Sequence, residues 1–136
     1  LLESELYDGI KELLSKLKKE NIKLGIASSK PQDYVEALLD HYGVKSYFDV
    51  ICGVTFSADC ESKANIISRC IKELDTQGNE TLMVGDKKYD IDGAKANMID
   101  SVGVMWGYGS RVEFASAGAK FIAEKIDDVF AIALLF

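Results

Sequence analysis

Short apolar runs alternate with amphipathic segments along the chain. In the longer segments apolar residues recur at helical spacing, as Ile10, Leu14 and Leu17 do, which is typical of a helix with one buried face. The runs between them are short and mostly end at glycine or serine, which favours buried strands. The sequence predicts strands at residues 22–27, 48–52, 81–84, 101–105 and 121–123. It predicts helices at residues 9–20, 31–42, 62–74, 90–96 and 127–134, and another from residue 111. Ser62 and Ser110 are expected to cap the helices that follow them.

This alternation determines the fold class. Strands separated by helices pair in parallel through right-handed crossovers, and their helices cover both faces of the sheet. We therefore predict an α/β fold with a three-layer, Rossmann-like parallel sheet and helices on both faces. The 136 residues, of which 48% are hydrophobic, fit one soluble domain with a substantial core.

Charge and hydropathy exclude some classes of function. The net charge of −6 argues against a dominant nucleic-acid surface, but it leaves room for a local basic pocket. No apolar run approaches membrane-spanning length, and the chain does not open with a signal-peptide pattern. We therefore expect neither a nucleic acid nor a membrane as partner. Cys52, Cys60 and Cys70 lack metal-binding spacing, so we expect reduced thiols in a cytoplasmic protein.

The stretch from Thr81 to Ala94 carries the most specific chemical signal. Its apolar run stops at Gly85, and Asp86 and Asp90 follow four residues apart. Asp86 falls at the carboxyl end of a strand, where open parallel sheets bind their ligands. Two carboxylates near each other suit Mg²⁺, which takes one or two carboxylates and keeps several waters. The alternative is that Asp90 only caps the following helix and Asp86 only ends the strand.

Other polar residues follow the first and second predicted strands. Ser28 and Ser29 lie at a strand end beside a helix start, where hydroxyls and free amides suit a phosphate. Alternatively, Ser29 simply caps its helix. Lys63 lies in the first turn of its helix, where a cation opposes the helix dipole, and it could equally face solvent. Taken together, hydroxyls, a lysine and a carboxylate pair at successive sheet-edge positions indicate a phosphate site.

In their order and spacing, these residues resemble the haloacid dehalogenase (HAD) superfamily, specifically its phosphoglycolate phosphatase-like branch. The second motif corresponds to residues 25–31, the third to Lys63 in Glu-Ser-Lys-Ala, and the fourth to residues 85–90. The segment Gly-Val-Met-Trp-Gly-Tyr-Gly-Ser-Arg at residues 103–111 also looks like the sequence that follows the fourth motif in this branch. The resemblance covers the whole chain.

The resemblance implies a role for each site residue. Ser28 would donate a hydrogen bond to a phosphoryl oxygen, with Ser29 beside it. Lys63 would neutralise charge on the phosphate and the nucleophile. Asp86 would ligate magnesium directly, and Asp90 would hold the metal's waters or orient Lys63. Physically, fixed cations and donors would stabilise the charge that phosphoryl transfer develops.

One part of the family pattern is missing from these residues. Its first motif is an Asp-x-Asp on the first strand, which supplies the attacking carboxylate. Asp90-Ile-Asp92 matches superficially but belongs to the fourth motif. The helical cap between the first and second motifs is missing as well. The chain also begins at Leu1, so we expect residues 1–136 to be the carboxyl-terminal part of the core domain of a longer phosphatase.

The missing first strand also predicts an assembly. The resemblance implies a strand order of 3-2-1-4-5, so the predicted strands at residues 22–27 and 81–84 would border an empty position. Unpaired strand edges recruit partners. We therefore expect an additional chain, self-association through swapping, or direct pairing between these two strands.

The sequence thus predicts a magnesium-dependent phosphohydrolase of a small phosphate monoester in the complete protein. These 136 residues alone are expected to be inactive, because the attacking carboxylate is absent. The alternative is a non-catalytic α/β module that binds anions or another protein chain. Substrate identity is left open, because the missing cap would contribute most of the selectivity.

Overall fold

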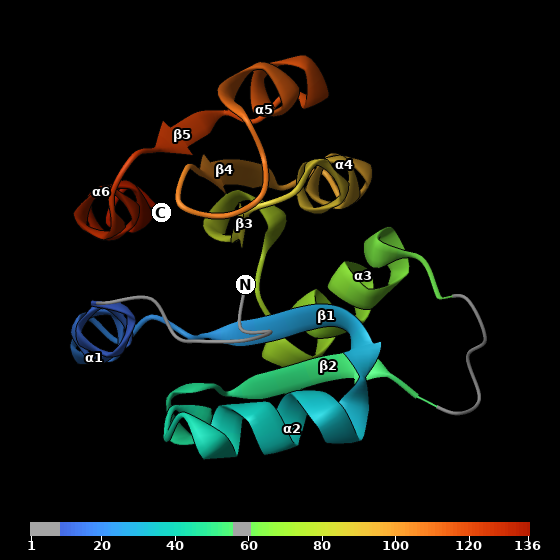
Figure 1. Cartoon of the computed structure of the whole chain (residues 1–136), viewed down its shortest axis with the longest axis vertical. Coiled ribbons are helices and arrows are strands. Elements are labelled where there is room, and N and C mark those ends of the chain that lie inside the picture. The colour runs from blue at the N-terminus through green and yellow to red at the C-terminus, as the bar shows by residue number, and fades with distance from the viewer. Residues whose placement is uncertain (1–8, 56–60) are drawn as a thin grey trace. The chain divides into compact units, whose positions relative to one another are not determined.

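The computed structural model describes residues 9–55 and 61–136, so Cys60 and residues 1–8 lie outside the described residues. The chain divides into two units, Leu1–Asp75 and Thr76–Phe136, and each is described by itself (Figure 1). Within the described residues, the helices are all too short or too polar to cross a membrane.

The first unit is a two-stranded parallel sheet with helices on both faces. Its strands are β1 (Gly25–Pro31) and β2 (Val50–Val54), and its helices are α1 (Ile10–Lys19), α2 (Gln32–His41) and α3 (Lys63–Leu74). A short 3₁₀ turn covers Lys45–Tyr47. Helices α2 and α3 each pack against both strands, and Figure 1 shows them on opposite sides of the sheet.

Helix α3 carries the core of this unit. Its buried residues Ile66, Cys70 and Leu74 pack with Cys52 of β2, and the half-buried Val50 completes the contact. Burial of such side chains stabilises a fold by about 1.5–3 kcal/mol each.

The second unit is a three-stranded parallel sheet in the order β3-β4-β5. Its strands are β3 (Leu82–Gly85), β4 (Asp100–Val104) and β5 (Phe121–Ala123). Its helices are α4 (Lys88–Ala96), α5 (Arg111–Ala117) and α6 (Ile126–Ala133), after a 3₁₀ turn at Gly78–Glu80. Helix α4 packs on β3 and β4, α5 packs on α4, and α6 packs on β5. Phe114 of α5 is fully buried against Ile91 of α4.

The predicted parallel α/β class is confirmed, and so are two of the helix starts. The Ser62 hydroxyl accepts a hydrogen bond from the Asn65 amide at 3.1 Å. The Ser110 hydroxyl accepts one from the Glu113 amide at 3.2 Å. These bonds satisfy amides that have no partner inside the helix.

Strand β1 is longer than predicted. It runs to Pro31 rather than ending at Ala27, so Ser28 and Ser29 lie inside the strand. The physical reason is the proline, which disfavours helical backbone in the residue before it and keeps Lys30 extended.

The strand neighbours agree with the predicted order for the strands that are present, since β1 pairs with β2 and β3 pairs with β4. Direct pairing of β1 with β3, one of three expected arrangements, would join the two units and stays a prediction. An additional chain and self-association stay predictions.

Burial makes Cys52 a poor nucleophile. Its side chain is fully buried, and this burial, helped by a hydrogen bond to Glu73, raises the pKa of the thiol to about 12. We expect Cys52 in the folded chain to react with iodoacetamide far more slowly at about pH 8 than in the urea-unfolded chain, because the thiolate is the reactive form. Peptide mass spectrometry after timed labelling measures both rates. Equal rates would contradict the buried placement.

Candidate functional site

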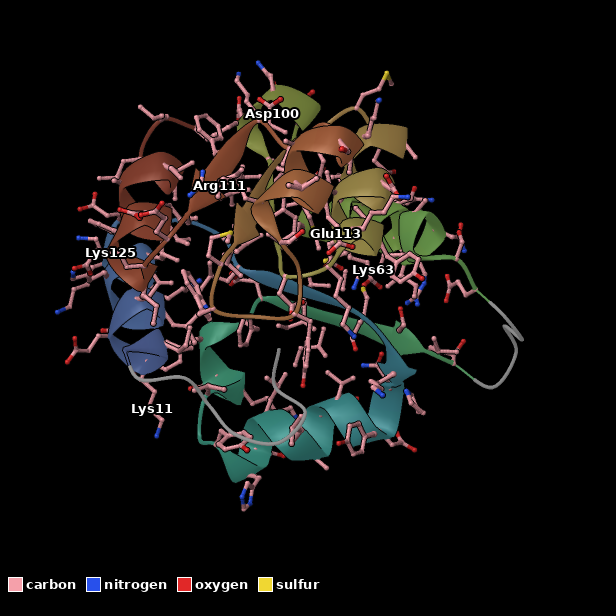
Figure 2. All side chains as sticks on the ribbon, turned by 45° about the horizontal axis from the view of Figure 1, so that its top comes forward. Lys11, Lys63, Asp100, Arg111, Glu113 and Lys125 are labelled. Atoms are coloured by element: carbon pink, nitrogen blue, oxygen red, sulfur yellow. The ribbon has the colours of Figure 1, made fainter. Side chains whose placement is uncertain are left out.

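Lys63 lies beside the bulged part of β1 and the serine segment. It is the first residue of α3 and is labelled in Figure 2. Its Nζ donates a hydrogen bond of 2.7 Å to the carbonyl oxygen of Ala27. Ser28 is the next residue along β1. The ammonium group is therefore held against β1 beside Ser28, and the alternative that Lys63 simply faces solvent is wrong. Its predicted phosphate contact stays a prediction.

The two serines differ in their surroundings. The Ser28 hydroxyl accepts a hydrogen bond from the Lys30 amide at 3.2 Å. Ser29 is exposed. Helix α2 begins after Pro31 and has no side-chain hydrogen bond at its cap. The alternative that Ser29 caps α2 is therefore wrong, and both serines stay candidates for anion binding.

A bulge in β1 shapes this segment. Ala27 lies opposite Cys52 and Pro31 lies opposite Val54, so three residues of β1 face Gly53 alone. Bulges of this kind redirect side chains and often lie next to functional sites. The bulge therefore sets the direction of the Ser28–Lys30 segment.

The Gln32 side chain replaces the ladder contacts that the bulge removes. Its Nε2 donates to the Ile51 carbonyl at 2.9 Å, and its Oε1 accepts from the Gly53 amide at 2.6 Å. A Cβ on Gly53 would lie 2.8 Å from the Gln32 Cα, so this approach requires glycine. Sequence reasoning missed Gln32, because nothing in the sequence shows that β1 bulges beside it.

Asp90 anchors the start of α4. Its Oδ2 accepts hydrogen bonds from the amides of Asp86 and Lys87, at 3.1 and 3.2 Å. Asp90 therefore caps α4, and whether it does only that is not tested. Its predicted role toward a metal or toward Lys63 stays a prediction.

Asp86 is not explained as a strand terminator. Its side chain is 5% exposed, and its Oδ2 is buried without a hydrogen-bond partner among the described residues. A buried charged oxygen without a partner is strongly unfavourable. This oxygen is therefore suited to a cation or a donor from outside the described residues.

The start of α6 provides an internal comparison. Asp128 Oδ2 accepts from the amides of Glu124 and Lys125 at 3.1 and 3.2 Å, as Asp90 does at α4. The residue equivalent to Asp86 is Glu124, which is exposed and forms an ion pair with Arg111. The cap is thus a recurring structural device, and the buried unpaired carboxylate is the feature particular to Asp86.

Asp86 and Asp90 offer few ligands for a magnesium ion. In the described part of the chain, no three His, Cys, Asp or Glu side chains come together as a metal site. Magnesium needs only one or two carboxylates, since it keeps several waters. Asp86 offers a free carboxylate oxygen, whereas one oxygen of Asp90 is already bonded to two amides.

Comparison with known proteins shows the family of the chain. The family described as haloacid dehalogenase-like hydrolase matches residues 2–104. The chain belongs to this family. A phosphoglycolate phosphatase from Colwellia psychrerythraea is 30% identical over 94% of the chain and 57% of that protein. The tyrosine-protein kinase PtkA from Mycobacterium tuberculosis is 36% identical over 82% of the chain and 38% of that protein.

Solved structures of relatives share the HAD fold. A predicted phosphatase from Clostridium acetobutylicum has a TM-score of 0.92 and 34% identity, and the match covers 97% of this chain and 61% of that one. The PtkA structure has a TM-score of 0.79 and 32% identity over 95% of this chain and 61% of that one. The chain therefore spans 38–61% of the length of these relatives.

The Gln32 bridge can be tested by removing its amide. We expect Gln32→Ala to lower the free energy of unfolding by about 1–3 kcal/mol, because the Gly53 amide and the Ile51 carbonyl lose their partners. Gln32→Glu should also destabilise, since it replaces the donor with an acceptor. Urea unfolding measures the stability, and hydrogen exchange at the Gly53 amide localises the change. The control is the exposed Gln77, where Gln77→Ala should have little effect. Unchanged exchange at Gly53 would contradict the bridge.

The two caps allow a matched comparison. We expect Asp90→Ala and Asp128→Ala each to cost about 0.5–2 kcal/mol of stability, because both remove a cap. In the complete protein only Asp90→Ala should also reduce activity, since Asp90 holds the amide of Asp86. Thermal unfolding and steady-state kinetics on both variants give the comparison. Equal losses of activity would show that stability alone is responsible.

Proposed function

We propose that the complete protein containing this chain is a magnesium-dependent phosphohydrolase that acts on a small phosphate monoester. The observation that carries the proposal is the buried, unpartnered carboxylate oxygen of Asp86 at the carboxyl end of β3. Ligand sites in open α/β sheets lie at such strand ends. Membership of the hydrolase family and the likeness to a phosphoglycolate phosphatase support the same activity.

Each residue has a proposed task. Ser28 and Ser29 bind phosphate oxygens through their hydroxyls and nearby amides. Lys63 supplies positive charge beside the phosphate, and its bond to the Ala27 carbonyl orients it. Asp86 ligates the metal, and Asp90 fixes the backbone from which Asp86 projects. Magnesium, when bound, neutralises charge on the phosphoryl oxygens.

The attacking carboxylate is proposed to come from outside these residues. The one Asp-x-Asp in the sequence is Asp90-Ile-Asp92, and Asp90 is occupied with capping α4. Nucleophilic catalysis needs a carboxylate free to attack phosphorus. The 136-residue chain by itself should therefore be inactive.

The same chemistry allows a second candidate. PtkA, a tyrosine-protein kinase by name, is more identical to this chain than the phosphoglycolate phosphatase is, at 36% against 30%. Kinases and phosphatases both transfer a phosphoryl group and differ in the acceptor, which is tyrosine or water. A tyrosine acceptor is therefore the second candidate. The non-catalytic module that binds anions or protein is the third.

Two further proposals concern the setting of the protein. The free thiols of Cys52 and Cys70 support a cytoplasmic location. Among the described residues β1 pairs with β2 alone and β3 with β4 alone. We propose that these free edges take up a strand from the rest of the complete protein or from an additional chain.

The test compares two carboxylates in equivalent turns. In the complete protein, Asp86→Asn should weaken the magnesium dependence and lower the turnover of p-nitrophenyl phosphate by about 10²-fold or more, because it removes a charge that acts on the reacting group. The matched control is Glu124→Gln, which changes the equivalent exposed residue and should leave both unchanged. Lys63→Ala should chiefly lower kcat.

Three outcomes would contradict the proposal. Unchanged metal dependence in Asp86→Asn would remove Asp86 from the site. Robust turnover by the 136-residue chain alone would overturn the missing-nucleophile argument. Asp86-dependent labelling of a tyrosine peptide by ATP, without phosphatase activity, would favour the kinase candidate.

A further inference from the structure

The segment between β4 and α5 lies directly on Asp86. We call residues 105–110, with the sequence Met-Trp-Gly-Tyr-Gly-Ser, the glycine loop. A Cβ on Gly107 would lie 2.3 Å from the Asp86 Cβ and 2.6 Å from its Oδ2. A Cβ on Gly109 would lie 2.7 Å from the Asp86 carbonyl oxygen. A side chain at Gly107 would therefore displace Asp86, whereas one at Gly109 would first meet the Phe114 ring at 2.4 Å.

This contact shields the carboxylate without satisfying it. The backbone of Gly107 occupies space beside Oδ2, yet none of the described residues donates a hydrogen bond to that atom. A buried carboxylate oxygen without a hydrogen-bond donor is unfavourable. Its charge therefore favours a cation that can reach it.

The glycine loop is tied to the start of α4. Lys87 Nζ lies 5.3 Å from the centre of the Tyr108 ring, a cation–π contact. The Lys87 amide in turn donates to Asp90. The glycine loop packs on the side chain of Asp86, and Asp90 holds its backbone amide. Lys87 contacts both the loop and Asp90, so it connects these two supports.

We infer that the glycine loop is a positioning element for the metal-binding carboxylate of Asp86, with Gly107 as its principal positioning residue. The inference rests on the magnesium site of the proposed function. By fixing the carboxylate and excluding water from it, the loop raises the affinity of Asp86 for the cation. A supporting group of this kind acts through the ligand and does not touch the metal.

Metal affinity tests the inference without relying on activity. Calorimetric titration of the complete protein with Mg²⁺ gives the Kd, and circular dichroism verifies the fold. Gly107→Ala should raise the Kd by about tenfold or more, as changes around metal ligands do. The matched control is Gly78→Ala, because a Cβ on Gly78 would meet its nearest atom at an ordinary 3.5 Å. Its Kd should equal that of the wild type.

Two substitutions of exposed tyrosines test the inference if Gly107→Ala does not fold. Tyr108→Leu removes the contact with Lys87 and should raise the Kd by about two- to fivefold, the scale of an exposed cation–π contact. Tyr89→Leu is its control, since Tyr89 is 70% exposed and Tyr108 is 66% exposed in the same unit. Tyr89→Leu should leave the Kd unchanged.

The outcomes separate the two claims. If Asp86→Asn weakens binding but Gly107→Ala and Tyr108→Leu bind Mg²⁺ as the wild type does, the inference is overturned and the proposed metal site stands. If Gly107→Ala does not fold, Tyr108→Leu alone decides. If wild type and Asp86→Asn bind alike, or neither binds, both the metal site and the inference are overturned.

Discussion

The burial of one carboxylate oxygen of Asp86 is the constraint on which the candidate site depends. The backbone places Asp86 directly after β3, and the glycine loop then lies against its side chain. Neither feature provides a donor for Oδ2 among the described residues. A fold keeps such an unfavourable group only where the surrounding structure stabilises it or where a ligand completes it. For this reason Asp86, rather than the more fully bonded Asp90, is the centre of the proposed chemistry.

The second unit contains the same aspartate cap at the starts of α4 and α6. Comparing the two shows which features belong to the cap and which are particular to Asp86. Asp90 and Asp128 cap their helices with the same pair of backbone hydrogen bonds. A short motif of this kind therefore carries no function by itself. The difference lies in tertiary packing, because Asp86 is covered by the glycine loop whereas Glu124 is exposed and paired with Arg111.

The sequence predicted those features that depend on interactions between residues near each other in the chain. Helical periodicity gave the buried face of α1, and the serines before α3 and α5 were correctly predicted as caps, since these effects act within one turn. The bulge in β1, the Gln32 bridge and the Gly107 contact could not be predicted in this way. Each depends on a segment from elsewhere in the chain, such as Gly53 for Gln32. The resemblance to the family pointed to residues 103–111 but not to their contact with Asp86.

Each unit holds its own candidate residues in place. In the first, Lys63 is held by the Ala27 carbonyl, and the bulged segment is held through Gln32. In the second, Asp90 and the glycine loop hold Asp86. Effects on stability add when the sites are independent. Phosphoryl transfer is different, because the lysine and the metal ligand act on the same charge in the transition state. Non-additive effects on turnover, combined with additive effects on stability, are therefore the signature that the two sets of residues serve one reaction.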